Sequence, residues 1–233
     1  MSALSRLKKS RLIGSLSLAI ACLAFTSFAS ANLLTDPGFE NQTVAPNPNP
    51  TGTPGWANFG GAGFLNTALA HSGSWVLDTP DEGGGYTVPG TYQVFAATPG
   101  ETFTLSGWVY TPNALVLNDN DFAILQLSWF TGSPPNNYAS GANGTAGVNV
   151  GDPAGGGGIP IAQGVWTFAS VTAVAPAGTN SMGAYLLDIN ADSNGDFYFD
   201  DMSLTATAVP EPTTLGVLGM IGIAALHRRR RRA

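Results

Sequence analysis

The sequence predicts an all-β protein, an antiparallel β-sandwich of the jelly-roll type, with one further helix at each terminus. Short runs rich in β-branched and aromatic residues recur from residue 74 to residue 204, and Gly, Pro, Asn and Asp bound each run. No part of this body shows a sustained 3.6-residue apolar period of the kind that an amphipathic helix needs. The 233 residues include 30 Gly and 16 Pro, which favours many turns.

Seven runs are the candidate strands: Ser74–Asp78, Thr91–Ala97, Thr102–Tyr110, Phe122–Phe130, Val165–Val174, Gly183–Ile189 and Phe197–Leu204. In Thr102–Tyr110, the apolar residues Phe103, Leu105 and Val109 alternate with Thr and Ser, as expected for a half-buried strand. Phe122–Phe130 is apolar on both faces for most of its length, which predicts a strand in the middle of the sandwich. Seven or more strands at these spacings predict one sandwich domain over residues 32–207.

The connections also carry predictions. Ala96–Glu101 has Pro and Gly at turn-forming positions and predicts a turn between two strands. Asn194-Gly195 predicts a two-residue hairpin between the last two runs. Asn41–Gly55 and Gly132–Gly164 are rich in Gly, Pro and Asn and predict loops. For the second we expect a surface loop with partial disorder, and the alternative is a loop that covers a binding face.

The first 31 residues read as a secretory signal. A basic start precedes an apolar run from Leu12 to about Phe28, and Ala29-Ser30-Ala31 fits a cleavage site between Ala31 and Asn32. An uncleaved membrane anchor and a lipoprotein cut at Cys22 are the alternatives. Since Cys22 is the one cysteine of the chain, cleavage after Ala31 excludes disulfides and cysteine-ligated metals from the exported protein.

The C-terminus has three parts in a fixed order. The motif Val209, Pro210, Glu211, Pro212 precedes an apolar segment at 213–226, which as a helix is about 21 Å long against about 30 Å of hydrocarbon. Five arginines at 228–232 follow and would stay on the cytoplasmic side. A plain tail anchor is the alternative to a sorting signal.

This tail resembles the PEP-CTERM sorting signal of Gram-negative bacteria. The resemblance implies export across the inner membrane, transient anchoring by the C-terminal segment, and cleavage near the motif by an exosortase-type membrane protease. The protein would then reach the cell surface or the medium. Such proteins typically accompany exopolysaccharide and biofilm production.

The distribution of charge excludes several functions. All nine Lys and Arg lie within the first 11 residues or at 228–232, whereas 14 of the 15 carboxylates lie between Asp36 and Asp201. Nucleic-acid partners are excluded because phosphate binding needs Lys or Arg. Catalysis through a Schiff base on Lys is excluded too, and so is an Arg that clamps an anionic substrate.

The body resembles the galactose-binding-like β-sandwich of many carbohydrate-binding modules. The matching pieces, in order, are Asn32–Glu40, Gly55-Trp56, Ala70–Trp75, Tyr92-Gln93, Thr98–Phe103, Leu105–Val109, Trp166–Phe168 and Asp196–Leu204. The resemblance implies a jelly roll, a structural calcium ion that joins the first and last strands, and glycan binding through aromatic side chains.

In that family the calcium ligands include the Glu after Gly-Phe and the Asp pair of the final strand, here Glu40 with Asp200 or Asp201. The residues offer separate support. In the last run the apolar residues are odd-numbered up to Phe199 and even-numbered from Met202 onward. The alternation therefore shifts by one residue at Asp200-Asp201, as a β-bulge would produce. Two adjacent carboxylates without Lys or Arg need a cation or open solvent. A solvated acidic strand end is therefore the alternative.

A second acidic cluster matches the spacing of an EF-hand loop. Its members are Asn190, Asp192, Asn194 and Asp196, with Gly195 at the sixth position and Asp201 at the twelfth. Strand-like runs rather than helices flank it, and the Asn-Gly hairpin explains the same residues. A metal site with EF-hand spacing and an ordinary hairpin therefore both account for these residues.

Glycan contacts are expected from aromatic rings, which stack on the C–H faces of sugars. Trp56 and Tyr86 lie in Gly-rich surroundings and are the candidates, while most of the five Trp residues are expected in the core. No catalytic residue is assigned: G-x-S-x-G and H-E-x-x-H are absent, and His71 reads as a turn or core residue. The sequence therefore favours a non-catalytic protein that binds neutral extracellular polysaccharide. The alternatives are a structural matrix protein without a specific ligand and a glycoside hydrolase that uses a carboxylate pair.

Overall fold

The computed structural model describes residues 31–41, 56–80, 85–112, 121–132, 141–151, 158–190 and 196–207. The chain divides into two units, Met1–Ala31 and Asn32–Ala233, and the strands found in the described ranges belong to the second. The helices expected at the two termini and the sorting motif lie outside the described residues. Within the described ranges, no helix has the length and apolar character needed to span a bilayer.

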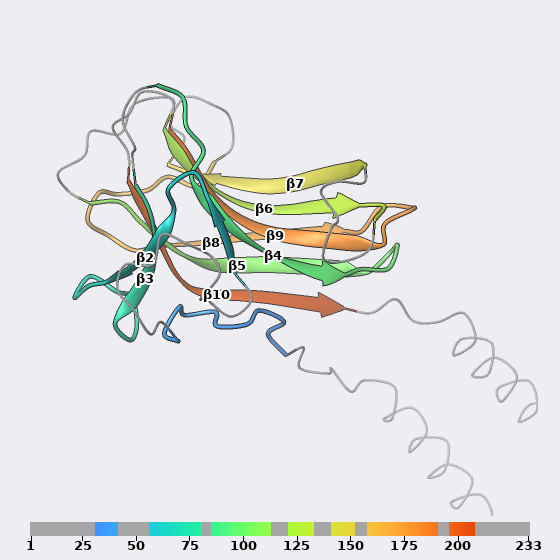
Figure 1. The fold of residues 1–233 in the computed structure, drawn as a ribbon, viewed down its shortest axis with the longest axis horizontal. Helices are drawn as coiled ribbons and strands as arrows, with labels where there is room; N and C mark the ends of the chain where they lie inside the picture. The colour runs from blue at the N-terminus through green and yellow to red at the C-terminus, as the bar shows by residue number, and fades with distance from the viewer. Residues whose placement is uncertain are drawn as a thin grey trace, which may run out of the picture. The chain divides into compact units, whose positions relative to one another are not determined.

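Ten strands form two five-stranded antiparallel sheets (Figure 1). Sheet A has the order β1 (Ala57–Phe59), β4 (Gly90–Ala96), β9 (Ser181–Ile189), β6 (Phe122–Phe130), β7 (Ala142–Val150). Sheet B has the order β2 (Gly63–Asn66), β3 (Trp75–Thr79), β10 (Phe197–Thr207), β5 (Thr102–Tyr110), β8 (Thr167–Val174). From β3 to β10 the chain changes sheet at each step except between β6 and β7, which pair directly. This is the strand order of a jelly roll, so the predicted fold class is confirmed.

The inner faces of the two sheets form the core. In β5, Phe103, Leu105 and Val109 are at most 1% exposed, while the alternating Thr and Ser residues lie on the outer face. The turn expected at Ala96–Glu101 is present: the Glu101 N–H donates to the Thr98 carbonyl, and Gly100 has a φ of 89°. All seven predicted runs are strands, with bounds that differ by at most a few residues.

The predicted hairpin between the last two runs is wrong. β9 pairs with β4 and β6 in sheet A, whereas β10 pairs with β3 and β5 in sheet B. Both edges of each strand are therefore taken by other partners. Residues 191–195, which include Asn194-Gly195, connect the two sheets instead and lie outside the described residues.

The loop predicted at 132–164 is also corrected, because it contains β7. Alternate residues of β7, Ala146, Val148 and Val150, face the core, and the strand pairs with β6. Ile159 then forms a parallel bridge with Val150. The small side chains and Gly residues of β7 have weak strand propensity, so the pairing with β6 decides its conformation. The short strands β1 and β2 were not predicted either.

The segment from Asn32 onward lies beside β10. The Leu33 N–H donates to the Leu204 carbonyl, and the Leu204 N–H donates to the Asn32 side-chain oxygen. The Asn32 amide donates in turn to the Met202 carbonyl. These bonds hold the opening segment against β10, and Glu40 lies near Asp200 and Asp201 of that strand. Cleavage between Ala31 and Asn32 stays a prediction.

Candidate functional site

The three predicted calcium ligands lie at one junction between the opening segment and β10. A Cβ added at Gly38 would lie 3.6 Å from Asp201 Oδ1, 3.9 Å from Glu40 Cγ and 4.0 Å from Asp200 Oδ1. The three carboxyl side chains thus surround Gly38, although 160 or more residues separate Glu40 from the aspartates. We call this set the acidic junction.

The backbone at the acidic junction is irregular on both sides. In the opening segment Asp36 and Phe39 have φ values of 51° and 58°, and in β10 Asp201 has a φ of 49°. The register of β10 against β5 shifts between Asp200 and Ser203, so the predicted bulge is present. It brings the two adjacent carboxyl groups to one side of the strand, where a regular strand would direct them to opposite faces.

Residues 71–75 cover the acidic junction with hydrogen-bond donors. Glu40 Oε1 accepts from the N–H groups of Ser74 at 2.8 Å and Trp75 at 2.9 Å. A Cβ at Gly73 would overlap the Glu40 carboxylate, and Gly73 has a φ of 62°, so both the contact and the backbone need glycine there.

The two aspartates bind the same segment. Asp200 Oδ2 accepts from the Ser72 N–H at 3.0 Å, and Asp201 Oδ1 accepts from the Ser72 hydroxyl at 2.7 Å. His71 Nδ1 lies 2.7 Å from Asp201 Oδ2. Burial raises the pKa of Asp200 to about 6, against a partial lowering by the N–H bond from Ser72. His71, expected in a turn or the core, is thus a partner of the acidic junction.

The acidic junction has the donor chemistry that calcium prefers. Ca²⁺ takes carboxylate and carbonyl oxygens, and the chain offers three carboxylates here without a Lys or Arg beside them. Among the described residues, however, no three His, Cys, Asp or Glu side chains are grouped as a ready ligand set. An ion would therefore compete with the N–H and O–H donors of residues 71–75 for the same oxygens.

The second acidic cluster is described only at its ends. Asn190 is fully buried, and its backbone pairs with Thr87 through two hydrogen bonds of 2.8 and 3.1 Å. Asp196 is half-buried at the start of β10. Asp192 and Asn194 lie outside the described residues, so the second metal site stays a prediction.

The two glycan candidates differ. Trp56 is 2% exposed, packs on Phe39 at 5.3 Å between ring centroids, and donates from its indole N–H to the Asp36 carbonyl at 3.0 Å. Its assignment as a surface sugar contact is wrong, because the ring anchors the opening segment in the core. Tyr86 is 69% exposed just before β4, so its ring is accessible.

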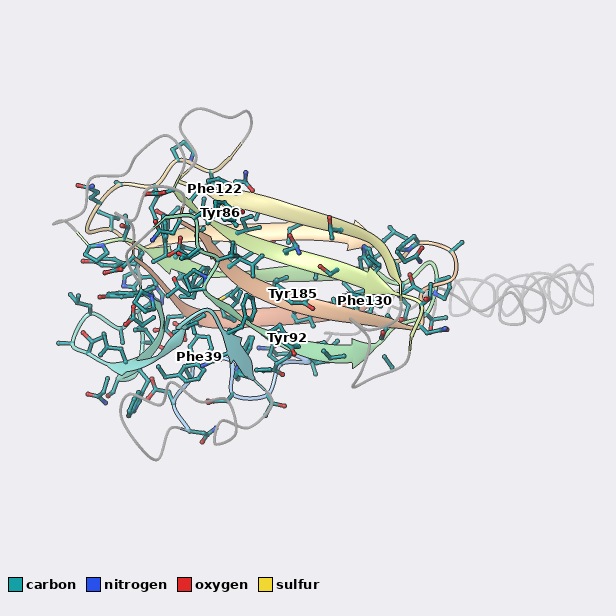
Figure 2. The ribbon with its side chains drawn as sticks, turned by 45° about the horizontal axis from the view of Figure 1, so that its top comes forward. Phe39, Tyr86, Tyr92, Phe122, Phe130 and Tyr185 are labelled. Carbon is teal, nitrogen blue, oxygen red and sulfur yellow. The ribbon has the colours of Figure 1, made fainter. Side chains whose placement is uncertain are left out.

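The outer face of sheet A carries a further aromatic pair that the sequence reading missed. Tyr92 of β4 and Tyr185 of β9 are register partners, with ring centroids 5.0 Å apart and planes at 21°. The next strand places Gln126 beside Tyr185. Figure 2 shows both Tyr side chains on this sheet, between Phe122 and Tyr86 at one end and Phe130 at the other. Strand alternation could have indicated the pair, because Tyr92 and Tyr185 are each out of phase with the core residues of their strands.

This tyrosine pair lies in neutral surroundings. The outward positions of β4, β9, β6 and β7 include no charged residue. A Cβ at Gly183 would overlap the Tyr185 ring, so this ring lies down along its own strand rather than standing away from the sheet. Both rings are half-buried and keep part of their surface in solvent. The arrangement suits a neutral ligand that stacks on aromatic rings.

Comparison with protein families supports the analysis of the C-terminus. Residues 208–232 match the PEP-CTERM protein-sorting motif. The chain therefore carries a sorting signal of exported proteins, with the apolar segment and arginines in the expected order. No curated protein matches the sequence.

Solved structures share the fold of the body. A Stig cyclase from Fischerella sp. TAU has a TM-score of 0.52 at 15% identity, over 78% of this chain and 99% of the cyclase. The carbohydrate-binding module TmCBM61, solved with β-1,4-galactotriose, has a TM-score of 0.46 at 14% identity, over 76% and 100%. A family 16 carbohydrate-binding module has a TM-score of 0.46 at 15% identity, over 75% and 99%. At 15% identity the likeness to the cyclase extends to the fold alone. The part of the sequence that matches a family model is the sorting motif at residues 208–232.

Proposed function

We propose that this protein is an exported, non-catalytic polysaccharide-binding protein, and that the outer face of sheet A holds a neutral glycan. The observation that carries the proposal is the Tyr92–Tyr185 pair, two stacked rings in the middle of an uncharged sheet face. Sugar rings bind aromatic side chains through their C–H faces, and Gln126 beside Tyr185 offers an amide to sugar hydroxyls. Tyr86 would extend the same surface at its end.

The charge of the body supports a neutral ligand. Between residues 12 and 227 the sequence has no Lys or Arg, so a polyanionic glycan would meet only carboxylates. The sorting motif supports a location where polysaccharide is present. An exosortase-type protease of a Gram-negative bacterium would cleave near residues 209–212 and leave the sandwich at the cell surface, in a biofilm matrix.

We also propose a structural calcium ion at the acidic junction. Glu40, Asp200 and Asp201 would hold it through carboxylate oxygens. The ion would supply positive charge between the opening segment and β10, where the chain has no Lys or Arg.

A glycan array with the purified protein tests the proposed function. We expect binding to neutral glycans and none to uronic-acid polymers. Tyr185→Ala should weaken binding about fivefold, because loss of one stacking ring removes about 1 kcal/mol. Tyr185→Phe keeps the ring and is the matched control. An empty array with correctly folded protein would favour the alternative of a structural matrix protein.

A glycoside hydrolase is the second candidate, and one pair of carboxyl groups favours it. Burial raises the pKa of Asp78 to about 6, and the charge of Asp196 contributes. A protonated Asp78 could act as general acid toward a glycosidic oxygen, with Asp196 as base or nucleophile. Release of reducing sugar by the wild type, and its loss in Asp78→Asn, would favour this candidate over a binding protein.

A further inference from the structure

The outer face of sheet B has a regular, uncharged pattern of hydroxyl groups. Strands β10, β5 and β8 are neighbours, and their register aligns three rows across the sheet. The rows are Ser203–Ser106–Ser170, Thr205–Thr104–Thr172 and Thr207–Thr102–Val174. Eight of these nine side chains therefore carry a hydroxyl, and none is charged. We call this surface the hydroxyl face.

The geometry of the hydroxyl face is fixed by the sheet. Neighbouring strands lie about 4.8 Å apart, and alternate residues of one strand repeat at about 6.7 Å. Thr side chains have restricted χ1 angles, so their hydroxyls hold their positions before a ligand arrives. Thr104 Oγ1 and Thr172 Oγ1 are 2.8 Å apart and hydrogen-bonded. Ser170, Thr172 and Thr207 are exposed, and the β5 members are half-buried.

An aromatic cluster continues the hydroxyl face at one end. Trp108 and Phe168 form the next row of β5 and β8, with ring centroids 5.4 Å apart. Phe168 is 51% exposed. His71 stacks on Trp108 at 4.2 Å, and the Trp166 indole donates to the Leu69 carbonyl at 3.0 Å, so residues 69–71 brace the cluster. The rings and the rows together extend about 20 Å along β5.

We propose that the hydroxyl face and the Trp108–Phe168 row form a second polysaccharide-binding surface, on the opposite side of the sandwich from the Tyr92–Tyr185 pair. Each hydroxyl donates and accepts hydrogen bonds, as sugar hydroxyls do, and the two rings provide a stacking end. The surface has no Lys or Arg, and Asp200 of the acidic junction is the register partner of Trp108, so a polyanionic chain would be repelled and the ligand is an extended neutral glycan. The inference extends the proposed function, because it adds a second site on a different sheet.

Two sites on opposite faces make the protein a cross-linker of polysaccharide chains. The two outer faces point away from the shared core, so one stiff chain cannot occupy both. A protein with a site on each face joins two chains, and a network forms when many copies do so. This would give the exported protein a structural effect on a matrix without catalysis.

The test uses the purified protein with soluble β-1,4-galactan, xylan and mixed-linkage β-glucan. Binding is measured by pull-down and stoichiometry by calorimetry with a short oligosaccharide of the bound polymer; cross-linking is measured by turbidity. Phe168→Ala combined with Thr172→Val removes one ring and one hydroxyl from exposed positions of β8. Thr172→Ser, which keeps the hydroxyl, is the matched control, and Tyr185→Ala disables the other face.

We expect the wild type to bind two oligosaccharides per chain and to raise turbidity. Either Phe168→Ala/Thr172→Val or Tyr185→Ala should bind one oligosaccharide and lose the turbidity, and the combination of all three should lose binding. Unchanged turbidity in Phe168→Ala/Thr172→Val would overturn the second surface while the proposed function stands. Full binding in Tyr185→Ala with loss in the sheet B variant would overturn the sheet A site and leave the second surface. A stable dimer without glycan, broken by Phe168→Ala/Thr172→Val, would overturn the inference in favour of a self-association face.

Discussion

Asp78 illustrates how one side chain can set the pH dependence of stability. It lies on β3 opposite Tyr198, and burial followed by the charge of Asp196 raises its pKa from 3.8 to about 6. The folded state therefore binds this proton more tightly than the unfolded state. Ionisation of Asp78 costs stability as the pH rises from about 4 to about 6, and below pH 4 the cost is absent.

We expect Asp78→Asn to flatten this part of the stability profile. At pH 7 the variant should be more stable than the wild type by at most about 2.7 kcal/mol, since a shift of about two pKa units corresponds to that free energy. At pH 4 the two proteins should be alike. Urea unfolding at pH 4, 5, 6 and 7 measures the difference. The pKa of Asp200 is also raised to about 6, so the free energy of unfolding of both proteins should still fall somewhat as the pH rises through this range. Parallel profiles would contradict the prediction.

Single residues were predictable where alternation or burial decides their place. Phe103, Leu105 and Val109 face the core as their spacing indicates. Trp56 was placed wrongly, because a Gly-rich neighbourhood does not reveal that the ring closes over Phe39. Most Trp residues were expected in the core, whereas the even position of Trp108 in β5 puts this ring on the outer face. Composition near a residue was a poorer guide than its phase in the strand.

At the level of elements, the acidic junction ties the opening segment to the last strand. If calcium binds there, it stabilises the folded state by about 2.7 kcal/mol at a hundredfold excess over its dissociation constant. Chelation should then lower the melting temperature by several degrees, as expected for a domain of this size. Monovalent salt at equal ionic strength should not restore it, because screening is not coordination.

Glu40→Gln separates coordination from hydrogen bonding at this junction. The amide oxygen of Gln can still accept from the Ser74 and Trp75 N–H groups, but the negative charge is lost. We expect the variant to fold and to lose most of its response to calcium in thermal melts. Thr98→Ser is the control, because Thr98 donates its N–H to Glu101 in a turn far from the junction. This variant should keep the full stabilisation by calcium. Equal melting curves of the wild type with calcium and with chelator would contradict calcium binding. The three carboxylates would then serve as hydrogen-bond acceptors for residues 71–75 alone.

Strands with a clear apolar pattern in the sequence could be predicted, but the strands with which they pair could not. Thr102–Tyr110 and Phe122–Phe130 have the predicted bounds because alternating or continuous apolar residues define them. β7 escaped prediction because Gly and Ala in it have little strand propensity of their own and only β6 makes it a strand. The Asn-Gly hairpin failed for the converse reason: local turn preference cannot show that β9 and β10 belong to different sheets.

For the whole molecule, the distribution of charge predicts a large change on maturation. The full chain has a formal charge of −6, from 15 carboxylates and nine Lys and Arg. All nine cations lie in the first 11 residues or at 228–232. A protein that begins at Asn32 and ends near Pro212 keeps every carboxylate from Asp36 to Asp201 and no cation, which gives at least −14. Self-repulsion at this charge keeps copies apart and favours a bound cation.

The two cleavages can be read from the mass and charge of the released protein. We expect intact-mass spectrometry of surface or medium material to show a chain from Asn32 to the region of residues 209–212, and the same material to elute from an anion exchanger later than the full chain. If the five arginines keep the C-terminal end on the cytoplasmic side, as the sequence predicts, a protease in the membrane would cut before them. Pro210→Ala with Glu211→Ala should therefore keep the protein in the membrane fraction with its arginines, while Thr205→Ser should be released normally. Peptides from residues 228–232 in released wild-type material would show that the segment is an anchor rather than a sorting signal.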